Sequence, residues 1–205
     1  MELKELKERL DLDLERSLVS PSVLLDDLSV IDERDRKLSQ YVDPLYVPVY
    51  YHLGKYLKPN NLLEFGLGLG LFSTCFMKSC KTVENFLGFQ EKTDKYYSDK
   101  FALRNIKKVL NGNISLYYGQ PADKKFFEAV SKRKWNVAIL HEEKDYDEHM
   151  FELDISWQHL DEDGYLIIDH ISSKNTSTAF ENFCKIENRK PIFIETRYKL
   201  GIAKK

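Results

Sequence analysis

Residues 61–73 read NLLEFGLGLGLFS, and this stretch decides the fold. The apolar run Leu62–Phe65 is typical of a buried strand, and it leads through Gly66, Gly68 and Gly70 into a segment with helical character. Glycine has no Cβ, so it can take positive φ angles and let a ligand approach the main chain closely. The stretch therefore predicts a ligand-binding loop at the carboxyl end of a first β-strand.

Beyond residue 61, short β-type runs alternate with helical periods, which is typical of a parallel sheet covered by helices on both faces. The last two runs are separated by only a few residues, so they must pair antiparallel. We therefore expect an α/β fold: a doubly wound, mostly parallel seven-stranded sheet with a C-terminal antiparallel hairpin. An apolar stripe from Tyr146 to Leu160 predicts one of the helices. The expected strands are Leu62–Phe65, Asn85–Phe89, Ile114–Tyr118, Asn136–Leu140, Tyr165–Asp169, Pro191–Thr196 and Leu200–Ala203.

Residues 1–58 differ from the rest and predict an N-terminal helical extension or cap on a Rossmann-like domain formed by residues 59–205. Leucines at helical spacing between Leu3 and Leu14 indicate a first, amphipathic helix, and the segment 20–22 is expected to break it and start a second. A later helix-like segment ends near Pro59. Its tyrosines either provide aromatic walls for a substrate or complete a core. The tyrosines considered for these roles are Tyr46, Tyr50 and Tyr51, and Tyr56 lies in the same segment.

The composition narrows the range of partners. The 205 residues include 31 Lys and Arg against 33 Asp and Glu, a net charge of −2, which argues against a protein built to coat nucleic acid. No apolar run approaches the ~18 residues that a membrane-spanning helix requires, and the start of the chain does not look like a signal peptide. We therefore expect a cytoplasmic protein with a small-molecule substrate and with neither nucleic acid nor membrane as partner.

The glycine spacing distinguishes two cofactors. A dinucleotide-binding loop needs Gly-x-Gly-x-x-Gly, and Leu71 stands at its third glycine position. The observed Gly-x-Gly-x-Gly, preceded by Glu64 at the strand end, resembles motif I of the class I S-adenosylmethionine-dependent methyltransferases over roughly residues 60–205. The resemblance implies that the loop contacts the methionine part of the cofactor and that Glu64 helps to fix its amino group. Alternatively, the glycine turn serves only helix–sheet packing.

The resemblance also assigns further cofactor contacts. The family places an acidic residue at the end of the second strand to accept the ribose hydroxyls, whereas this chain has Gln90 there and Glu91 one residue later. Either Glu91 substitutes or cofactor affinity is reduced, since an amide makes a weaker contact than a carboxylate. Gln120 or Asp123 after the third strand is expected to contact adenine or to cap a helix, and His141 is included among the cofactor-binding residues.

The ends of the fourth and fifth strands resemble small-molecule O-methyltransferases of the catechol and caffeoyl-coenzyme A type. In that group an Asp after strand four and an Asp-Asn pair after strand five hold a divalent cation, and a Lys three residues beyond the first Asp is the base. Matched residue by residue, Lys144 is the base and Asp169 a metal ligand, while His141 and His170 replace Asp and Asn.

Two of these assignments have alternatives. Two imidazoles and one carboxylate favour Fe, Mn, Co or Zn over Mg. If the metal has been lost, His141 and His170 instead form local hydrogen bonds. Lys144 is either the base or a solvated lysine among Glu142, Glu143 and Asp145.

The leading hypothesis is an S-adenosylmethionine-dependent methyltransferase that methylates an oxygen of a small molecule. The main rival is a catalytically degenerate, methyltransferase-like binding or interaction protein, because Gln90, His141 and His170 depart from the family pattern. A nicotinamide oxidoreductase is disfavoured by Leu71. Nucleic-acid methylation is disfavoured because the chain has no basic stripe and no Asn-Pro-Pro-Tyr or Pro-Cys signature.

Overall fold

The computed structural model describes residues 1–16, 23–24, 47–91, 99–120, 123–141, 143–196 and 198–205. A seven-stranded sheet runs through this part of the chain in the order β3-β2-β1-β4-β5-β7-β6. Neighbours from β3 to β5 are parallel, whereas β7 pairs antiparallel with β5 and β6, as expected from the sequence. The strands are β1 (Asn61–Phe65), β2 (Asn85–Glu91), β3 (Asn113–Gly119), β4 (Trp135–Leu140), β5 (Leu160–Ile168), β6 (Ile192–Ile194) and β7 (Leu200–Lys204).

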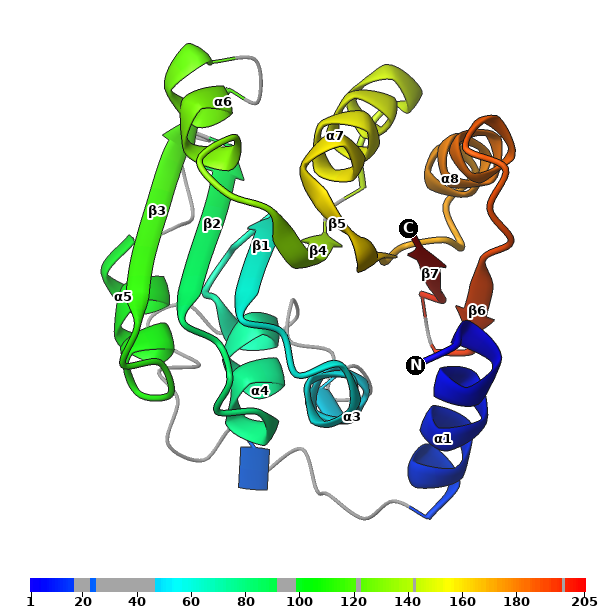
Figure 1. Ribbon diagram of the computed structural model, residues 1–205, viewed down its shortest axis with the longest axis horizontal. Coiled ribbons are helices and arrows are strands. Elements are labelled where there is room, and N and C mark those ends of the chain that lie inside the picture. The colour runs from blue at the N-terminus through cyan, green and yellow to red at the C-terminus, as the bar shows by residue number, and fades with distance from the viewer. Residues whose placement is uncertain (17–22, 25–46, 92–98, 121–122, 142, 197) are drawn as a thin grey trace, which may run out of the picture.

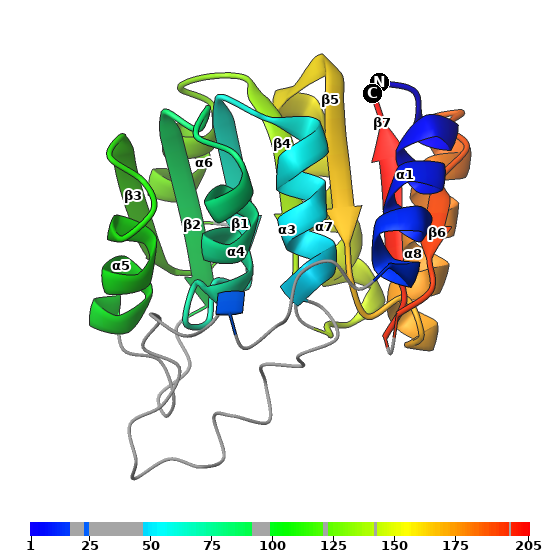
Figure 2. The ribbon, with the colours of Figure 1, turned by 90° about the horizontal axis from the view of Figure 1, so that it is seen from below.

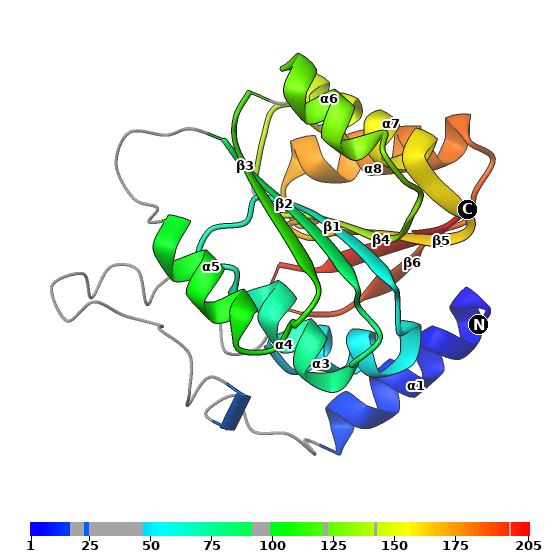
Figure 3. The same cartoon turned by 60° about the vertical axis from the view of Figure 1, so that its left-hand side comes forward.

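Helices cover both faces of the sheet (Figures 1 and 2). One face carries α1 (Leu3–Glu15), α3 (Val47–Leu57), α4 (Leu71–Ser79) and α5 (Asp99–Lys107). The opposite face carries α6 (Lys124–Val130), α7 (Tyr146–His159) and α8 (Lys174–Ile186), as Figure 3 shows from the side. The strand order reverses between β1 and β4. In open α/β sheets ligands bind beyond the carboxyl ends of the strands at such a point. The fold therefore predicts a ligand site at the carboxyl ends of β1 and β4.

The side chains of the central strands alternate between two hydrophobic cores. In β1, Leu62 packs on the α3 and α4 side while Leu63 packs on the α7 and α8 side. In β4, Ile139 packs on the α3 and α4 side and Leu140 on the α7 and α8 side, because successive side chains of a strand point to opposite faces. The strands are therefore buried on both faces, which accounts for their nearly continuous apolar sequence.

Most strand boundaries differ by one or two residues from the sequence-based expectation, and the largest difference lies at the junction of α7 and β5. Leu160 fits the apolar stripe of the preceding helix, but α7 ends at His159 and Leu160 is the first residue of β5. There it pairs with Trp135 of β4, a contact between residues 25 positions apart. This long-range pairing overrides the local helical period. Of the predicted second N-terminal helix only residues 23 and 24 are described, and both are helical. Tyr46 and its predicted role lie outside the described residues.

The N-terminal helices share a core with the sheet. Leu6 and Leu10 of α1 belong to the same buried cluster as Leu53 of α3 and Leu62 of β1. Between α1 and α3, the largely buried carboxylate of Asp13 accepts hydrogen bonds from Lys55 at 2.9 Å and from the hydroxyl of Tyr56. The division into an extension (1–58) and a domain (59–205) stays a prediction. Within the described residues, no helix combines the length and apolar character needed to cross a membrane.

Helix α3 lies directly against α4 at Gly54. A Cβ built on Gly54 would lie 2.0 Å from the main-chain oxygen of Phe76 and 2.4 Å from the hydroxyl of Ser79. Real Cβ atoms do not approach a main-chain oxygen so closely, so any other residue must push the two helices apart. A glycine in mid-helix is thus required here despite its low helix propensity.

We expect Gly54→Ala to destabilise the protein by about 2 kcal/mol or more, because α3 and α4 must separate. Intrinsic helix propensity alone would favour Ala over Gly by about 1 kcal/mol, so the sign of the change distinguishes the two effects. The free energy of unfolding in urea provides the measurement. An increase in stability would show that the two helices are not in close contact.

Candidate active site

The loop between β1 and α4 has the left-handed backbone expected of its glycines. The φ angles are 78° at Gly66, 50° at Gly68 and 65° at Gly70, a region that residues with a Cβ rarely adopt. The amides of Gly66 and Leu67 donate to the carbonyl of Phe89 in β2 at 3.0 and 3.1 Å. The loop therefore follows the carboxyl end of β2 closely.

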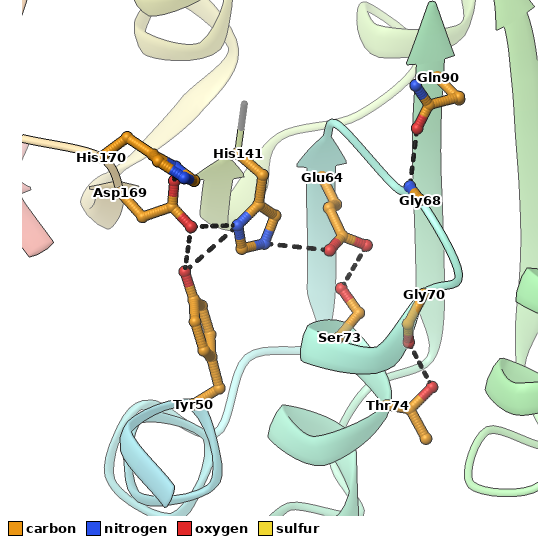
Figure 4. A network of polar contacts seen from close by, with 10 residues as sticks. All are labelled: Tyr50, Glu64, Gly68, Gly70, Ser73, Thr74, Gln90, His141, Asp169 and His170. Atoms are coloured by element: carbon orange, nitrogen blue, oxygen red, sulfur yellow. Dashed lines mark hydrogen bonds and ion pairs between the residues drawn. The ribbon is translucent and has the colours of Figure 1, made fainter. Parts of the chain in front are cut away.

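Side chains from two neighbouring elements hold this loop in place. The Oε1 of Gln90 in β2 accepts a hydrogen bond from the amide of Gly68 at 2.7 Å (Figure 4). Asn105 of α5 donates from its Nδ2 to the carbonyl of Leu69 at 3.0 Å. Gln90 is 2% exposed and thus belongs to the scaffold of the loop. Its predicted contact with the ribose hydroxyls stays a prediction, and its side-chain oxygen already has a partner.

Strand alternation brings three predicted residues to the same face. Glu64, His141 and Asp169 each lie two positions after a strand residue that packs on the α3 and α4 side, so all three polar side chains point toward α3 and α4. These strand residues are Leu62, Ile139 and Ile167. Because β1, β4 and β5 are adjacent and parallel, the three lie next to one another at the carboxyl edge of the sheet.

These residues form one network, drawn in Figure 4, which we call the polar cluster. It consists of Tyr50, Glu64, His141, Asp169 and His170. The Nδ1 of His141 donates to Oδ2 of Asp169 at 2.7 Å, and its Nε2 faces Oε1 of Glu64 at 3.2 Å. Glu64, Asp169 and His141 are 0, 2 and 4% exposed. The imidazole is therefore placed between two buried carboxylates.

The charges of the polar cluster follow from this arrangement. Burial disfavours a charge on His141, but Asp169 and Glu64 outweigh burial and raise the pKa of His141 to about 10. Burial would likewise favour a neutral Asp169, yet His141 and His170 hold the pKa of Asp169 well below its usual value. At neutral pH, His141 is thus an imidazolium between carboxylates.

Two further members of the polar cluster complete its surroundings. The hydroxyl of Tyr50, on α3, lies 3.4 Å from both Nδ1 of His141 and Oδ2 of Asp169. His170 has a left-handed backbone (φ 57°), contacts Oδ1 of Asp169 through its Nδ1 and stacks on Tyr198. The side chain of His170 is 32% exposed and is thus more accessible than those of His141 and Asp169, which are 4% and 3% exposed. Burial lowers its pKa, but Asp169 outweighs burial and raises it.

The three residues predicted to bind a metal, His141, Asp169 and His170, contact one another in the structure. Among the described residues, no group of three or more histidine, cysteine, aspartate or glutamate side chains could hold a metal ion. His141 has a carboxylate next to each ring nitrogen, and His170 turns its Nδ1 to Asp169, so these side chains bind one another. Such local contacts of the histidines are what the alternative without a metal predicts. The metal hypothesis stays a prediction.

The predicted base, Lys144, lies in the loop between β4 and α7. Its Nζ is 2.6 Å from Oε1 of Glu152, a residue of α7 that is 0% exposed, and 3.8 Å from Oε2 of Glu91. Lys144 is therefore an ion-paired residue rather than a solvated one. Its role as base stays a prediction.

The predicted adenine contacts lie at the end of β3. The carboxylate of Asp123 accepts hydrogen bonds from the hydroxyl of Tyr117 at 2.8 Å and from the amide of Gln120 at 3.1 Å. Asp123 stands at the N-cap position of α6, although its side chain makes no capping hydrogen bond. Both roles considered for Gln120 and Asp123 thus remain predictions, and Asp123 has local partners.

Sequence reasoning missed two contributions to the site. Ser73 of α4 donates from its hydroxyl to Oε2 of Glu64 at 2.6 Å, and Tyr50 provides a hydroxyl to the polar cluster, whereas the sequence suggested an aromatic wall or a core position for it. The position of Ser73 in the first turn after the glycine loop was the available signal. No spacing rule places Tyr50 beside Asp169, because the two residues lie 119 positions apart.

The chain resembles solved methyltransferase structures over its whole length, although it matches no protein-family model and no curated protein sequence. The O-methyltransferase TomG from Streptomyces achromogenes, in complex with S-adenosylmethionine and involved in tomaymycin synthesis, superimposes with a TM-score of 0.68 at 9% identity, covering 100% of this chain and 98% of that one. The S-adenosylhomocysteine-bound methyltransferase PaMTH1 from Podospora anserina gives 0.65 at 11% identity, covering 99% and 96%. An O-methyltransferase from Bacillus cereus in complex with S-adenosylhomocysteine gives 0.60 at 13% identity, covering 90% and 96%.

These similarities define the fold. The chain has the Rossmann-like fold of the class I S-adenosylmethionine-dependent methyltransferases, as motif I suggested. Because the identities lie between 9 and 13%, they establish the architecture alone.

We expect His141→Gln to lower the free energy of unfolding at pH 7 by about 3 kcal/mol or more, because two buried carboxylates lose their cation. The pKa of about 10 in the folded state lies above the ordinary histidine value of 6.5, so the folded state retains a proton that the unfolded chain releases. This contribution is complete below pH 6.5 and disappears as the pH rises toward 10. Urea unfolding of both proteins should therefore give a difference that narrows between pH 7 and pH 10; a constant difference would contradict the assignment.

Proposed function

We propose that the protein is an S-adenosylmethionine-dependent methyltransferase that methylates an oxygen of a small molecule. The observation that carries this proposal is the left-handed glycine loop at the carboxyl end of β1, next to the polar cluster. The loop follows the strand at which the strand order of the sheet reverses, where ligands bind in this architecture. The O-methyltransferases with the same fold support the reaction class.

The residues at this edge fit the proposed cofactor. Gly66, Gly68 and Gly70 leave the main chain without Cβ atoms, as close contact with a ligand requires. Glu91 ends β2, and its side chain is 26% exposed, so its carboxylate is accessible for ribose hydroxyls. S-adenosylmethionine would supply an electrophilic methyl group on a sulfonium. The amino-group contact assigned to Glu64 would add to the partners that its two oxygens already have, Ser73 and His141.

The polar cluster provides charged groups in fixed positions where the methyl acceptor would bind. His141 and Asp169 hold each other in one orientation, and Tyr50 extends this set from α3. Such preorganisation positions an acceptor oxygen without reorganising the protein during the reaction. Removal of the acceptor proton is assigned to Lys144 as a prediction. The cytoplasmic location expected from the sequence belongs to the same proposal.

The second candidate is a methyltransferase-like binding protein without turnover. It is favoured by the self-contained nature of the polar cluster, in which His141 has a carboxylate at each ring nitrogen. Both functions require cofactor binding, so turnover is the property that distinguishes them.

The decisive experiment combines binding with turnover. Calorimetric titration with S-adenosylhomocysteine, with and without added Mg²⁺, Mn²⁺ or Zn²⁺, should give a single binding site that does not require the ion. Transfer of a radiolabelled methyl group from S-adenosylmethionine to a panel of small phenols and alcohols then tests the reaction. Binding without transfer to any of them would favour the second candidate, and binding of NADH in place of the nucleoside would overturn the cofactor assignment.

We expect Gly68→Val to weaken the binding of S-adenosylhomocysteine by tenfold or more while the fold remains intact. Gly68 has a φ of 50°, and a β-branched residue there costs roughly 1–2 kcal/mol, so the loop must rearrange. Calorimetry gives the affinity, and circular dichroism confirms the fold. Ile186→Val on the exposed face of α8 is the control and should bind as the wild type does. An unchanged affinity of Gly68→Val would place the cofactor elsewhere.

A further inference from the structure

A buried ion pair connects the loop after β4 with α7. Glu152 is completely buried on the inner face of α7, where an uncompensated carboxylate would be very unfavourable. The Nζ of Lys144 lies 2.6 Å from Oε1 of Glu152 and so provides the compensating charge. Only 5% of the Lys144 side chain is exposed. Its ammonium is thus held in a defined position.

The loop that carries Lys144 is also held through its main chain. The amide of Lys144 donates to Nε2 of His149 in α7 at 3.2 Å, and the same nitrogen lies 2.9 Å from the hydroxyl of Thr176 in α8. Burial and the charge of Lys144 lower the pKa of His149 to about 4, so its ring is neutral and its Nε2 can accept. Both ends of the Lys144 residue, main chain and ammonium, are therefore anchored on the helices behind the sheet.

The held ammonium faces the residue that follows Gln90. Its Nζ lies 3.8 Å from Oε2 of Glu91, which is within ion-pair range but beyond hydrogen-bond distance. The attraction therefore orients the carboxylate of Glu91 without occupying its oxygens in a hydrogen bond to Lys144. A carboxylate has about four acceptor sites, and two adjacent hydroxyls need two of them.

We propose that Lys144 is a positioning residue for the cofactor: anchored by Glu152, it holds Glu91 in place to accept the ribose hydroxyls of the adenosyl group. This inference rests on the proposed function. In this arrangement Glu91 accepts the ribose hydroxyls in place of Gln90. The side-chain oxygen of Gln90 already accepts a hydrogen bond from the amide of Gly68. The same arrangement also gives Lys144 a role distinct from that of a base, which would have to come within about 3 Å of the acceptor hydroxyl.

The test is a double-mutant cycle on the affinity for S-adenosylhomocysteine. The variant Lys144→Met/Glu152→Gln removes both charges of the buried pair, so no orphaned carboxylate is left in the core. It is measured with Glu91 present and in combination with Glu91→Gln. Thermal unfolding verifies that each variant is folded. Should the double variant not fold, Lys144→Gln replaces it, since an amide still donates to Glu152 but carries no charge.

We expect Lys144→Met/Glu152→Gln and Glu91→Gln each to weaken binding about tenfold, and their combination to weaken it little further, since the ammonium acts through Glu91. Lys144→Arg should retain most of the affinity. Lys124→Met, which removes an exposed ion-paired lysine of α6, is the matched control and should leave the affinity unchanged.

Three outcomes would overturn the inference while the proposed function stands. In the first, the wild type binds and Lys144→Met/Glu152→Gln binds equally well. In the second, this variant weakens binding by the same factor with and without Glu91, as a general structural effect would. In the third, binding persists and only turnover is lost, which would make Lys144 the base. A wild type that does not bind S-adenosylhomocysteine would instead refute the proposed function and, with it, this role.

Discussion

The imidazolium of His141 between Glu64 and Asp169 is the interaction on which the site depends. Strands β1 and β5, which lie on either side of β4, bring two carboxylates to the same face of the sheet, where neither is exposed to solvent beyond 2%. Two buried negative charges would repel each other and would each be costly to desolvate. A cation between them compensates both and also connects the ends of β1, β4 and β5. The chemistry of the site and the stability of the fold therefore share the same residues.

The glycine loop depends on a second, neutral contact. Gln90 accepts the amide hydrogen of Gly68 at the position where the methyltransferase family that motif I resembles has an acidic residue for the ribose. A glutamine in this position can stabilise the loop without adding a third negative charge near Glu64 and Glu91. The glutamine thus has a structural explanation, and under the proposed function the acidic role falls to Glu91, the next residue in the chain.

The fold could be predicted from local patterns because its strands are buried on both faces and its glycine loop has a distinctive spacing. The same alternation of period two also allowed Glu64, His141 and Asp169 to be placed at the same edge. The end of the helix before Leu160 could not be predicted, because the local period favours a helix there. Leu160 belongs to the sheet only through its pairing with the distant residue Trp135. The partners of Lys144 were beyond reach for a similar reason, since Glu91 lies 53 positions away in sequence.

The close contact at Gly54 has a consequence for how the two sides of the site relate. Helix α3 carries Tyr50, and α4 begins directly after the glycine loop. With no side chain between them at Gly54, the two helices cannot slide past each other without a steric clash. Under the proposed function Tyr50 faces the acceptor and the glycine loop faces the nucleoside, so this contact is expected to keep the two sides of the site at a fixed separation.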